Sequence, residues 1–125
     1  MLKLWYNLTS IATLGSHCAL QVLKGAKDEG FKTVLICEKK RERLYRRFKF
    51  IDEMVIVDSF VEITEKKCES ALQENDSILI PHGTLISQMN SEQIESIKTP
   101  VFGNKYILRW ESDRMLKEQL MKEAK

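Results

Sequence analysis

The stretch Ile11-Ala12-Thr13-Leu14-Gly15-Ser16-His17 decides the fold of this chain. Its first four residues are typical of a short buried strand, which breaks at Gly15 and leads directly into a segment with helical periodicity. Ser16 is expected to cap that helix through its hydroxyl, and Gly30 is expected to end it. A strand that enters a helix through a glycine leaves free backbone N–H groups and the positive end of the helix dipole at its carboxyl end. The stretch therefore predicts a turn that suits a phosphate, although the further glycines of the dinucleotide-binding fingerprint are missing.

The composition is that of one ordinary globular domain. The chain has 125 residues, of which 43% are hydrophobic and 30% charged, and its net charge of +2 is too small to imply nucleic acid. Residues 1–8 are too short and mixed for a signal peptide or a membrane span. The three cysteines lack metal-ligand spacing, so we expect free thiols, no metal site and a cytoplasmic location.

Short apolar runs recur along the chain at intervals of 20 to 24 residues, and they start at Ile11, Val34, Met54, Ile78 and Val101. Continuous apolar runs suit strands that are covered on both faces. The intervals leave room for helices within 16–30, 38–48, 62–74 and 84–97. This alternation predicts an α/β fold, a Rossmann-like doubly wound parallel sheet of about five strands in the order 3-2-1-4-5.

The end of the chain differs from the rest. Residues 112–125 predict a charged helix with no stop signal, which suggests a continuation into a longer protein.

In such a sheet, ligands bind beyond the carboxyl ends of the strands at the point where the strand order reverses. The turn after the first strand holds Gly15, Ser16 and His17, and the turn after the fourth holds His82-Gly83-Thr84. Because strands one and four should be neighbours, these residues are expected to converge on one crevice. The alternative is that the glycines only make turns and the histidines only cap helices; the coincidence of position favours a ligand site.

A basic run with interleaved aromatic residues lies at 39–49. A nucleic-acid patch is one interpretation and a solvated helix face is the commoner one. Glu38 and Glu42 dilute the charge, so we expect no nucleic-acid partner. One of these arginines could instead reach a ligand phosphate. The sequence offers no pair of carboxylates, no nucleophile with a base and no Walker-type loop, so it assigns no catalytic residue.

Several motifs together resemble a known family, in this order: Ile11-Ala12-Thr13-Leu14-Gly15-Ser16-His17, Leu23-Lys24-Gly25-Ala26, Gly30-Phe31, Ile80-Pro81-His82-Gly83, Phe102-Gly103-Asn104 and Leu108-Arg109-Trp110-Glu111-Ser112-Asp113-Arg114. The family is the archaeal 5-formaminoimidazole-4-carboxamide ribonucleotide synthetase of purine biosynthesis, a formate-dependent ligase of the ATP-grasp superfamily. The resemblance covers only its N-terminal, pre-ATP-grasp domain.

The resemblance implies a function and a ligand. The family uses ATP and Mg²⁺ to join formate to the amine of aminoimidazole carboxamide ribonucleotide (AICAR), with formyl phosphate as intermediate. By motif, His17 resembles the family's substrate-binding histidine, and Thr84 stands where the family usually has a serine that contacts the ribonucleotide. Ser16, Gly15, His82 and Gly83 complete the expected substrate-binding set. The ATP and Mg²⁺ sites of the family have no counterparts here.

The resemblance also divides the chain, into a ribonucleotide-binding domain at 1–103 and a helical connection towards an ATP-grasp domain at 104–125. The expected partner is the small ribonucleotide AICAR, without a membrane, and a homo-oligomer is compatible with the sequence. Two other classes remain open. One is a free-standing module that binds a nucleotide monophosphate without catalysis. The other is half of a dinucleotide-binding oxidoreductase, disfavoured by the missing glycines.

Overall fold

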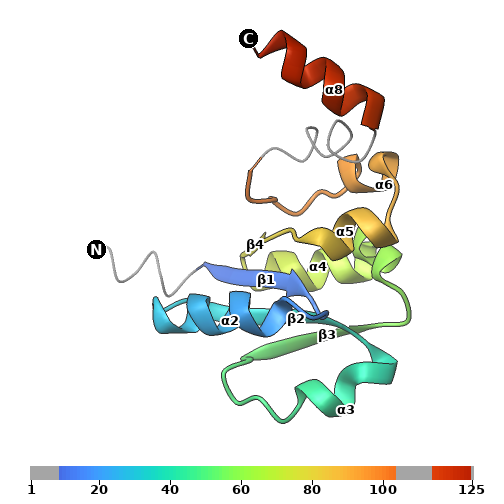
Figure 1. Ribbon diagram of the computed structural model, residues 1–125. Helices are drawn as coiled ribbons and strands as arrows, with labels where there is room; N and C mark the ends of the chain where they lie inside the picture. The colour runs from blue at the N-terminus through green and yellow to red at the C-terminus, as the bar shows by residue number, and fades with distance from the viewer. Residues whose placement is uncertain (1–8, 104–113, 125) are drawn as a thin grey trace.

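The computed structural model describes residues 9–103 and 114–124, and of residues 114–117 it describes the backbone alone. It is an α/β domain in which four strands alternate with helices (Figure 1). The strands are β1 (Ser10–Leu14), β2 (Lys32–Glu38), β3 (Glu53–Val57) and β4 (Ser77–Leu79). The α-helices are α2 (Ala19–Asp28), α3 (Glu42–Tyr45), α4 (Lys66–Glu74), α5 (Gly83–Gln88), α6 (Ser91–Glu95) and α8 (Arg114–Glu123), and two 3₁₀ helices are η1 (Lys39–Arg41) and η2 (Phe60–Thr64).

The sheet is parallel throughout and has the order β3-β2-β1-β4. Ser10 of β1 pairs with Lys32 of β2 on one side and with Ser77 of β4 on the other. The reversal of strand order therefore falls between β1 and β4, as the sequence predicts. The carboxyl ends of these two strands are the place where a ligand site is expected.

The expected fifth strand is reduced to a single bridge, so the count of about five is corrected to four. Val101 pairs with Leu79 in an isolated parallel bridge, and the backbone N–H of Phe102 donates to the carbonyl of Leu79 at 2.9 Å. Pro100 has no N–H with which to extend the ladder, and Gly103 turns the backbone away at a φ of 89°. Two apolar residues between a proline and a positive-φ glycine are too few for a strand.

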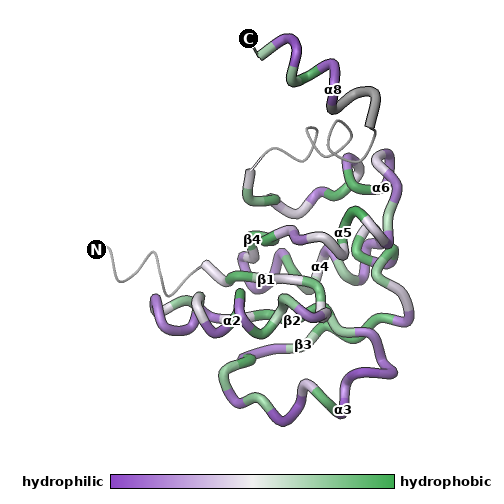
Figure 2. The backbone as a smooth tube through the Cα atoms, in the orientation of Figure 1, coloured by the Kyte–Doolittle hydropathy of each residue, from purple (hydrophilic) through white to green (hydrophobic). Residues whose placement is uncertain are grey.

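Both faces of the sheet are buried, which explains the continuous apolar runs. Along β2, Val34 and Ile36 belong to the larger core, beneath α4, α5 and α6, whereas Leu35 and Cys37 belong to a smaller core beneath α2 and α3. Adjacent residues of a strand point to opposite faces, so a strand covered on both sides is apolar at every position. Figure 2 shows the contrast with the largely hydrophilic segment around α3.

The first helix starts later than the sequence suggests. The N-cap of α2 is Cys18, with no side-chain hydrogen bond, so the expected cap at Ser16 is wrong. The end of α2 is as predicted: Gly30 has a φ of 92°, and the N–H groups of Gly30 and Phe31 donate to the carbonyls of Lys27 and Ala26. This is the Schellman arrangement, in which glycine takes the left-handed position.

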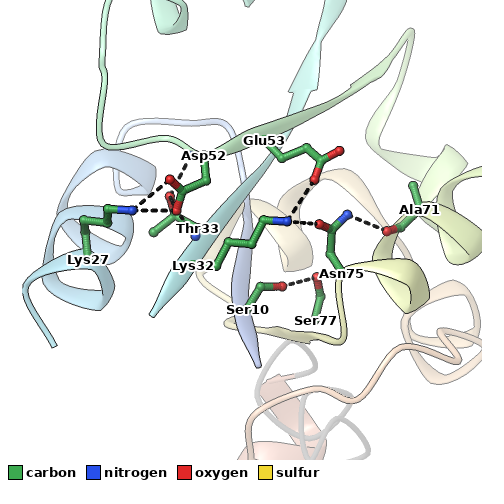
Figure 3. A network of polar contacts seen from close by, with 9 residues as sticks. All are labelled: Ser10, Lys27, Lys32, Thr33, Asp52, Glu53, Ala71, Asn75 and Ser77. Atoms are coloured by element: carbon green, nitrogen blue, oxygen red, sulfur yellow. Dashed lines mark hydrogen bonds and ion pairs between the residues drawn. The ribbon is translucent and has the colours of Figure 1, made fainter. Parts of the chain in front are cut away.

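A polar network fastens the amino ends of the strands, at the edge opposite the predicted site (Figure 3). The Nζ of Lys27 on α2 lies 2.8 Å from both carboxylate oxygens of Asp52, and the backbone N–H of Thr33 donates to Asp52 at 2.8 Å. The hydroxyls of Ser10 and Ser77 lie 2.6 Å apart across β1 and β4. The network therefore lies away from the carboxyl edge, where the ligand site is expected.

None of the helices in the described ranges is long and apolar enough to cross a membrane.

Candidate functional site: a pocket at the carboxyl ends of β1 and β4

The turn after β1 is folded tightly against β2. The N–H of Gly15 donates to the carbonyl of Ile36 at 2.7 Å. A Cβ at Gly15 would lie 3.2 Å from that carbonyl oxygen and 3.3 Å from Cε2 of Tyr45. A side chain at this position would force its neighbours to shift by a few tenths of an ångström, so the expected role of Gly15 in shaping the turn has a steric cause.

Two hydroxyls join the turns after β1 and β4. The Oγ1 of Thr84 donates to the Oγ of Ser16 at 2.6 Å, and both residues are buried. This bond spans 68 residues of sequence. It explains why Ser16 does not cap α2: its hydroxyl is drawn to a partner on another element. The structure thus brings together the two hydroxyls that the sequence placed on neighbouring turns.

His82 fastens the same junction through both ring nitrogens. Its Nε2 lies 3.0 Å from the carbonyl oxygen of Leu14 and 3.5 Å from the Oγ of Ser16. Its Nδ1 accepts from the N–H of Thr84 at 3.3 Å, which makes His82 the N-cap of α5. An Nδ1 that accepts places the proton on Nε2, where it donates to the Leu14 carbonyl. In this arrangement His82 holds the scaffold of the site.

Beside this junction lies an open pocket of about 380 Å³. Four of the six residues predicted for the site line it, namely Gly15, Ser16, His17 and Thr84. His82 and Gly83 lie in the second turn but are not among the lining residues. His17 is exposed, so its ring is available to a ligand. Four of the six predicted residues therefore share one pocket, while His82 and Gly83 lie outside its lining.

Five residues beyond the predicted set also line the pocket: Glu38, Arg41, Phe60, Ser87 and Gln88. A spacing signal exists for Ser87 and Gln88, which follow Thr84 by three and four residues and so share its side of α5. Arg41 comes from the basic run, one of whose arginines could reach a ligand phosphate. Glu38 ends β2 and could have been found by its place at the same sheet edge. Phe60 gave no polar signal.

The wall of the pocket is reinforced by a buried tyrosine. The hydroxyl of Tyr45 donates to the carbonyl of Ser16 at 3.1 Å. Burial raises the pKa of Tyr45, against the opposing influence of the Arg41 guanidinium. Tyr45 therefore stays protonated and holds the turn as a neutral hydrogen-bond donor.

Two of the three cysteines, Cys37 and Cys68, are buried in the core. Burial, with the nearby carboxylates, raises the pKa of both Cys37 and Cys68 to about 11. Both are protonated at neutral pH, and only the thiolate is reactive. Within residues 9–103 and 114–124, no three His, Cys, Asp or Glu side chains are grouped so that they could hold a metal ion.

A second pocket, also of about 380 Å³, lies at the amino end of β4 between α4 and residues 98–100. None of the residues predicted for the site lines it. Its position at the opposite edge of the sheet separates it from the strand-order reversal. The pocket at the carboxyl ends is therefore the candidate ligand site.

The curated relatives of this chain are named as synthetases of a formylated ribonucleotide. A 5-formaminoimidazole-4-carboxamide-1-(beta)-D-ribofuranosyl 5'-monophosphate synthetase from Nitrosopumilus maritimus (strain SCM1) is 72% identical over 117 residues, which are 94% of this chain and 34% of the relative. The chain thus spans about a third of the length of the curated relatives that it matches. These relatives confirm the resemblance that the sequence motifs indicated.

Solved structures agree with this comparison. The crystal structure of an IMP biosynthesis protein PurP from Thermococcus kodakaraensis matches with a TM-score of 0.75 and 33% identity, over 90% of this chain and 35% of that one. The N5-carboxyaminoimidazole synthetase from Staphylococcus aureus complexed with ADP matches with a TM-score of 0.70 over 95% of this chain and 30% of that one. At 13% identity, that second likeness shows the fold alone. Residues 11–125, which are nearly the whole chain, match the model of one family, and the chain belongs to that family, which is described as Protein of unknown function (DUF1246).

Proposed function

We propose that this chain is the N-terminal, substrate-binding part of a cytoplasmic ATP- and formate-dependent ligase that formylates AICAR in purine biosynthesis. The observation that carries the proposal is the pocket that joins His17, Ser16 and Thr84 at the reversal of strand order. The 72% identity to a synthetase named for the formylated ribonucleotide supports it. Residues 1–103 would form the binding domain and 104–125 the connection to the remainder of the ligase.

The pocket suits a ribonucleotide monophosphate. The turn after β1 offers the Ser16 hydroxyl to a phosphate, and the guanidinium of Arg41 supplies a positive charge in the same pocket. His17 is exposed beside them and would donate from a ring nitrogen. ATP and Mg²⁺ would be held by other parts of the ligase, and this chain would orient AICAR so that its amine meets the activated formate.

The test is the affinity of the 125-residue chain for AICAR, measured by calorimetric titration up to millimolar ligand. Truncation of His17 in His17→Ala removes a hydrogen bond to a charged or polar ligand group. Such a bond is worth about 1.5–3 kcal/mol if the group is charged, so the dissociation constant should rise about ten- to a hundredfold.

The control is Gln21→Ala, which truncates another exposed side chain one turn further along α2 and outside the pocket. It should bind like the parent chain. If His17→Ala also bound like the parent while its circular dichroism stayed native, the proposed site would be wrong.

A further inference from the structure

We propose that Glu38 recognises the ribose hydroxyls and so makes the pocket selective for ribonucleotides over deoxyribonucleotides. This inference rests on the proposed function, because it takes a ribonucleotide as the ligand. It adds a specificity-determining residue that neither the motifs nor the site predicted from them contained.

Glu38 is a poorly neutralised carboxylate on the pocket wall. It is the last residue of β2, and its side chain is only 18% exposed. Across the described part of the chain, its one ion pair is with the Nζ of Lys40 at 3.9 Å, and that lysine side chain is 71% exposed. So exposed a pair at such a distance contributes little. A half-buried carboxylate with acceptor capacity to spare is costly unless a donor completes it.

A ribose supplies the donors that match this acceptor. Its two adjacent hydroxyls can each donate to one oxygen of a carboxylate, as a charge-assisted pair. A free phosphate or a carboxylate ligand would instead be repelled by Glu38. The pocket therefore has an acceptor pole at Glu38 beside its donor groups, which are the turn after β1 and Arg41.

The spacing of the sheet places sugar and phosphate correctly. Neighbouring strands lie about 4.8 Å apart, so a ligand whose phosphate meets the turn after β1 carries its sugar to the end of β2. Dinucleotide-binding sheets bind a ribose hydroxyl with an acidic residue about 20 residues beyond their first glycine. Glu38 follows Gly15 by 23 residues and ends the neighbouring strand. This chain shares with dinucleotide-binding sheets only the acidic residue at the same edge of the sheet. The other glycines of those folds are missing here.

Arg41 keeps the combination electrostatically feasible. A phosphate and Glu38 are both anionic, and their repulsion would weaken binding in a partly buried pocket. The guanidinium of Arg41, three residues beyond Glu38 in η1, lines the same pocket and offsets that repulsion.

The experiment measures the affinity for AICAR and for its 2′-deoxy and 3′-deoxy forms. The proteins compared are the parent chain, Glu38→Gln and Glu29→Gln. The parent should bind at least one deoxy form about tenfold more weakly, since a hydrogen bond to a charged group is lost. Glu38→Gln should bind AICAR about tenfold more weakly than the parent does. Its affinities for AICAR and for the deoxy forms should differ by less than about threefold. Glu29→Gln, an exposed glutamate at the opposite edge of the sheet, should behave as the parent.

The outcomes separate this inference from the proposed function. If the parent binds the ribonucleotide but accepts both deoxy forms equally, Glu38 has no such role and the ligand assignment stands. Discrimination that persists in a natively folded Glu38→Gln chain overturns the role in the same way. If the parent binds no ribonucleotide at millimolar concentration, both proposals fall. The comparison of ligands on the parent does not depend on the folding of any variant.

Discussion

Gly15 shows how one residue without a side chain gives the site its shape. Its N–H is bound to the Ile36 carbonyl, and Cε2 of Tyr45 would lie 3.3 Å from a Cβ at this position. Any Cβ would press on a backbone oxygen of β2, which is held in the sheet and cannot yield as a flexible side chain would. The close approach places the neighbouring Ser16 where the hydroxyl of Thr84 can reach it.

Gly15→Ala should therefore destabilise the fold. The added methyl overpacks a rigid contact, and the free energy of unfolding should fall by about 1–3 kcal/mol in urea titrations. Gly25→Ala is the matched control, because nothing lies within 4 Å of a Cβ there and Gly25 sits inside α2. That substitution should raise stability by about 0.5–1 kcal/mol, through helix propensity. Equal effects of the two substitutions would contradict the steric argument.

Single residues also mark how far sequence reasoning reaches. His17, Ser16 and Thr84 could be predicted as neighbours, because a parallel sheet brings the ends of adjacent strands together. The capping role of Ser16 could not be excluded, since its competing partner lies 68 residues away. In the sequence, Glu38 lies beside a basic run, where it dilutes the charge and gives no sign of a pocket. Whether a carboxylate turns to solvent or into a pocket depends on the packing around it, which no local pattern encodes.

Among the elements, α2, β2 and the segment before β3 are tied together through one carboxylate. Asp52 receives hydrogen bonds from the ammonium of Lys27 and from the N–H of Thr33, as Figure 3 shows. Burial by itself raises the pKa of Asp52, but these bonds to the ionised form outweigh it, and the pKa is lowered from its ordinary value of 3.8. The ionised carboxylate is thus bound more favourably in the folded than in the unfolded chain.

The sign of this shift predicts an acid-sensitive contact. With the folded pKa depressed, the stabilisation from Asp52 is present above pH 3.8 and is lost as the pH falls through the folded value. Between about pH 5 and about pH 3, the free energy of unfolding of the parent should decline more steeply than that of Asp52→Asn.

Asp28→Asn provides the control, since Asp28 pairs with Lys24 on the exposed surface of α2. Exposed pairs of this kind contribute little, and the slope of stability against pH should match that of the parent. A parent-like slope in Asp52→Asn would show that the network does not respond to acid.

Strands and helices were predictable where burial dictates the pattern. The two-sided runs at Val34 and Ile11 are apolar at successive positions because both faces of the sheet are covered, and Gly30 ends α2 for a local steric reason. The run at Val101 has the same composition but forms one bridge. Its length, and the conformation of the glycine behind it, decide between a strand and a bridge, and hydropathy reports neither.

At the scale of the whole molecule, the two edges of the sheet have different tasks. The amino edge is crossed by ion pairs and hydrogen bonds that hold β1, β2 and β4 in place. The carboxyl edge is held by fewer bonds around Ser16 and carries an open pocket. Doubly wound sheets generally place ligands at that edge, so this division could be predicted from the strand–helix alternation alone.

The chain as a whole should bind substrate without completing the reaction. It spans about a third of its relatives, and no Walker-type loop occurs in it. We expect the purified chain to release no ADP in response to formate and AICAR, while it still binds AICAR. A coupled assay of ADP release measures the first and calorimetric titration the second. ADP release that required both formate and AICAR would refute this expectation.

The bond between Thr84 and Ser16 has a direction, and the direction gives the pocket a polarity. Because the Thr84 hydroxyl is the donor and the Ser16 oxygen the acceptor, the Ser16 hydroxyl still has its own proton to donate. Ser16 lines the pocket, so this proton is available to an acceptor such as a phosphoryl oxygen. A contact that joins two turns of the scaffold thereby also fixes which hydroxyl of the pair keeps a donor for the ligand.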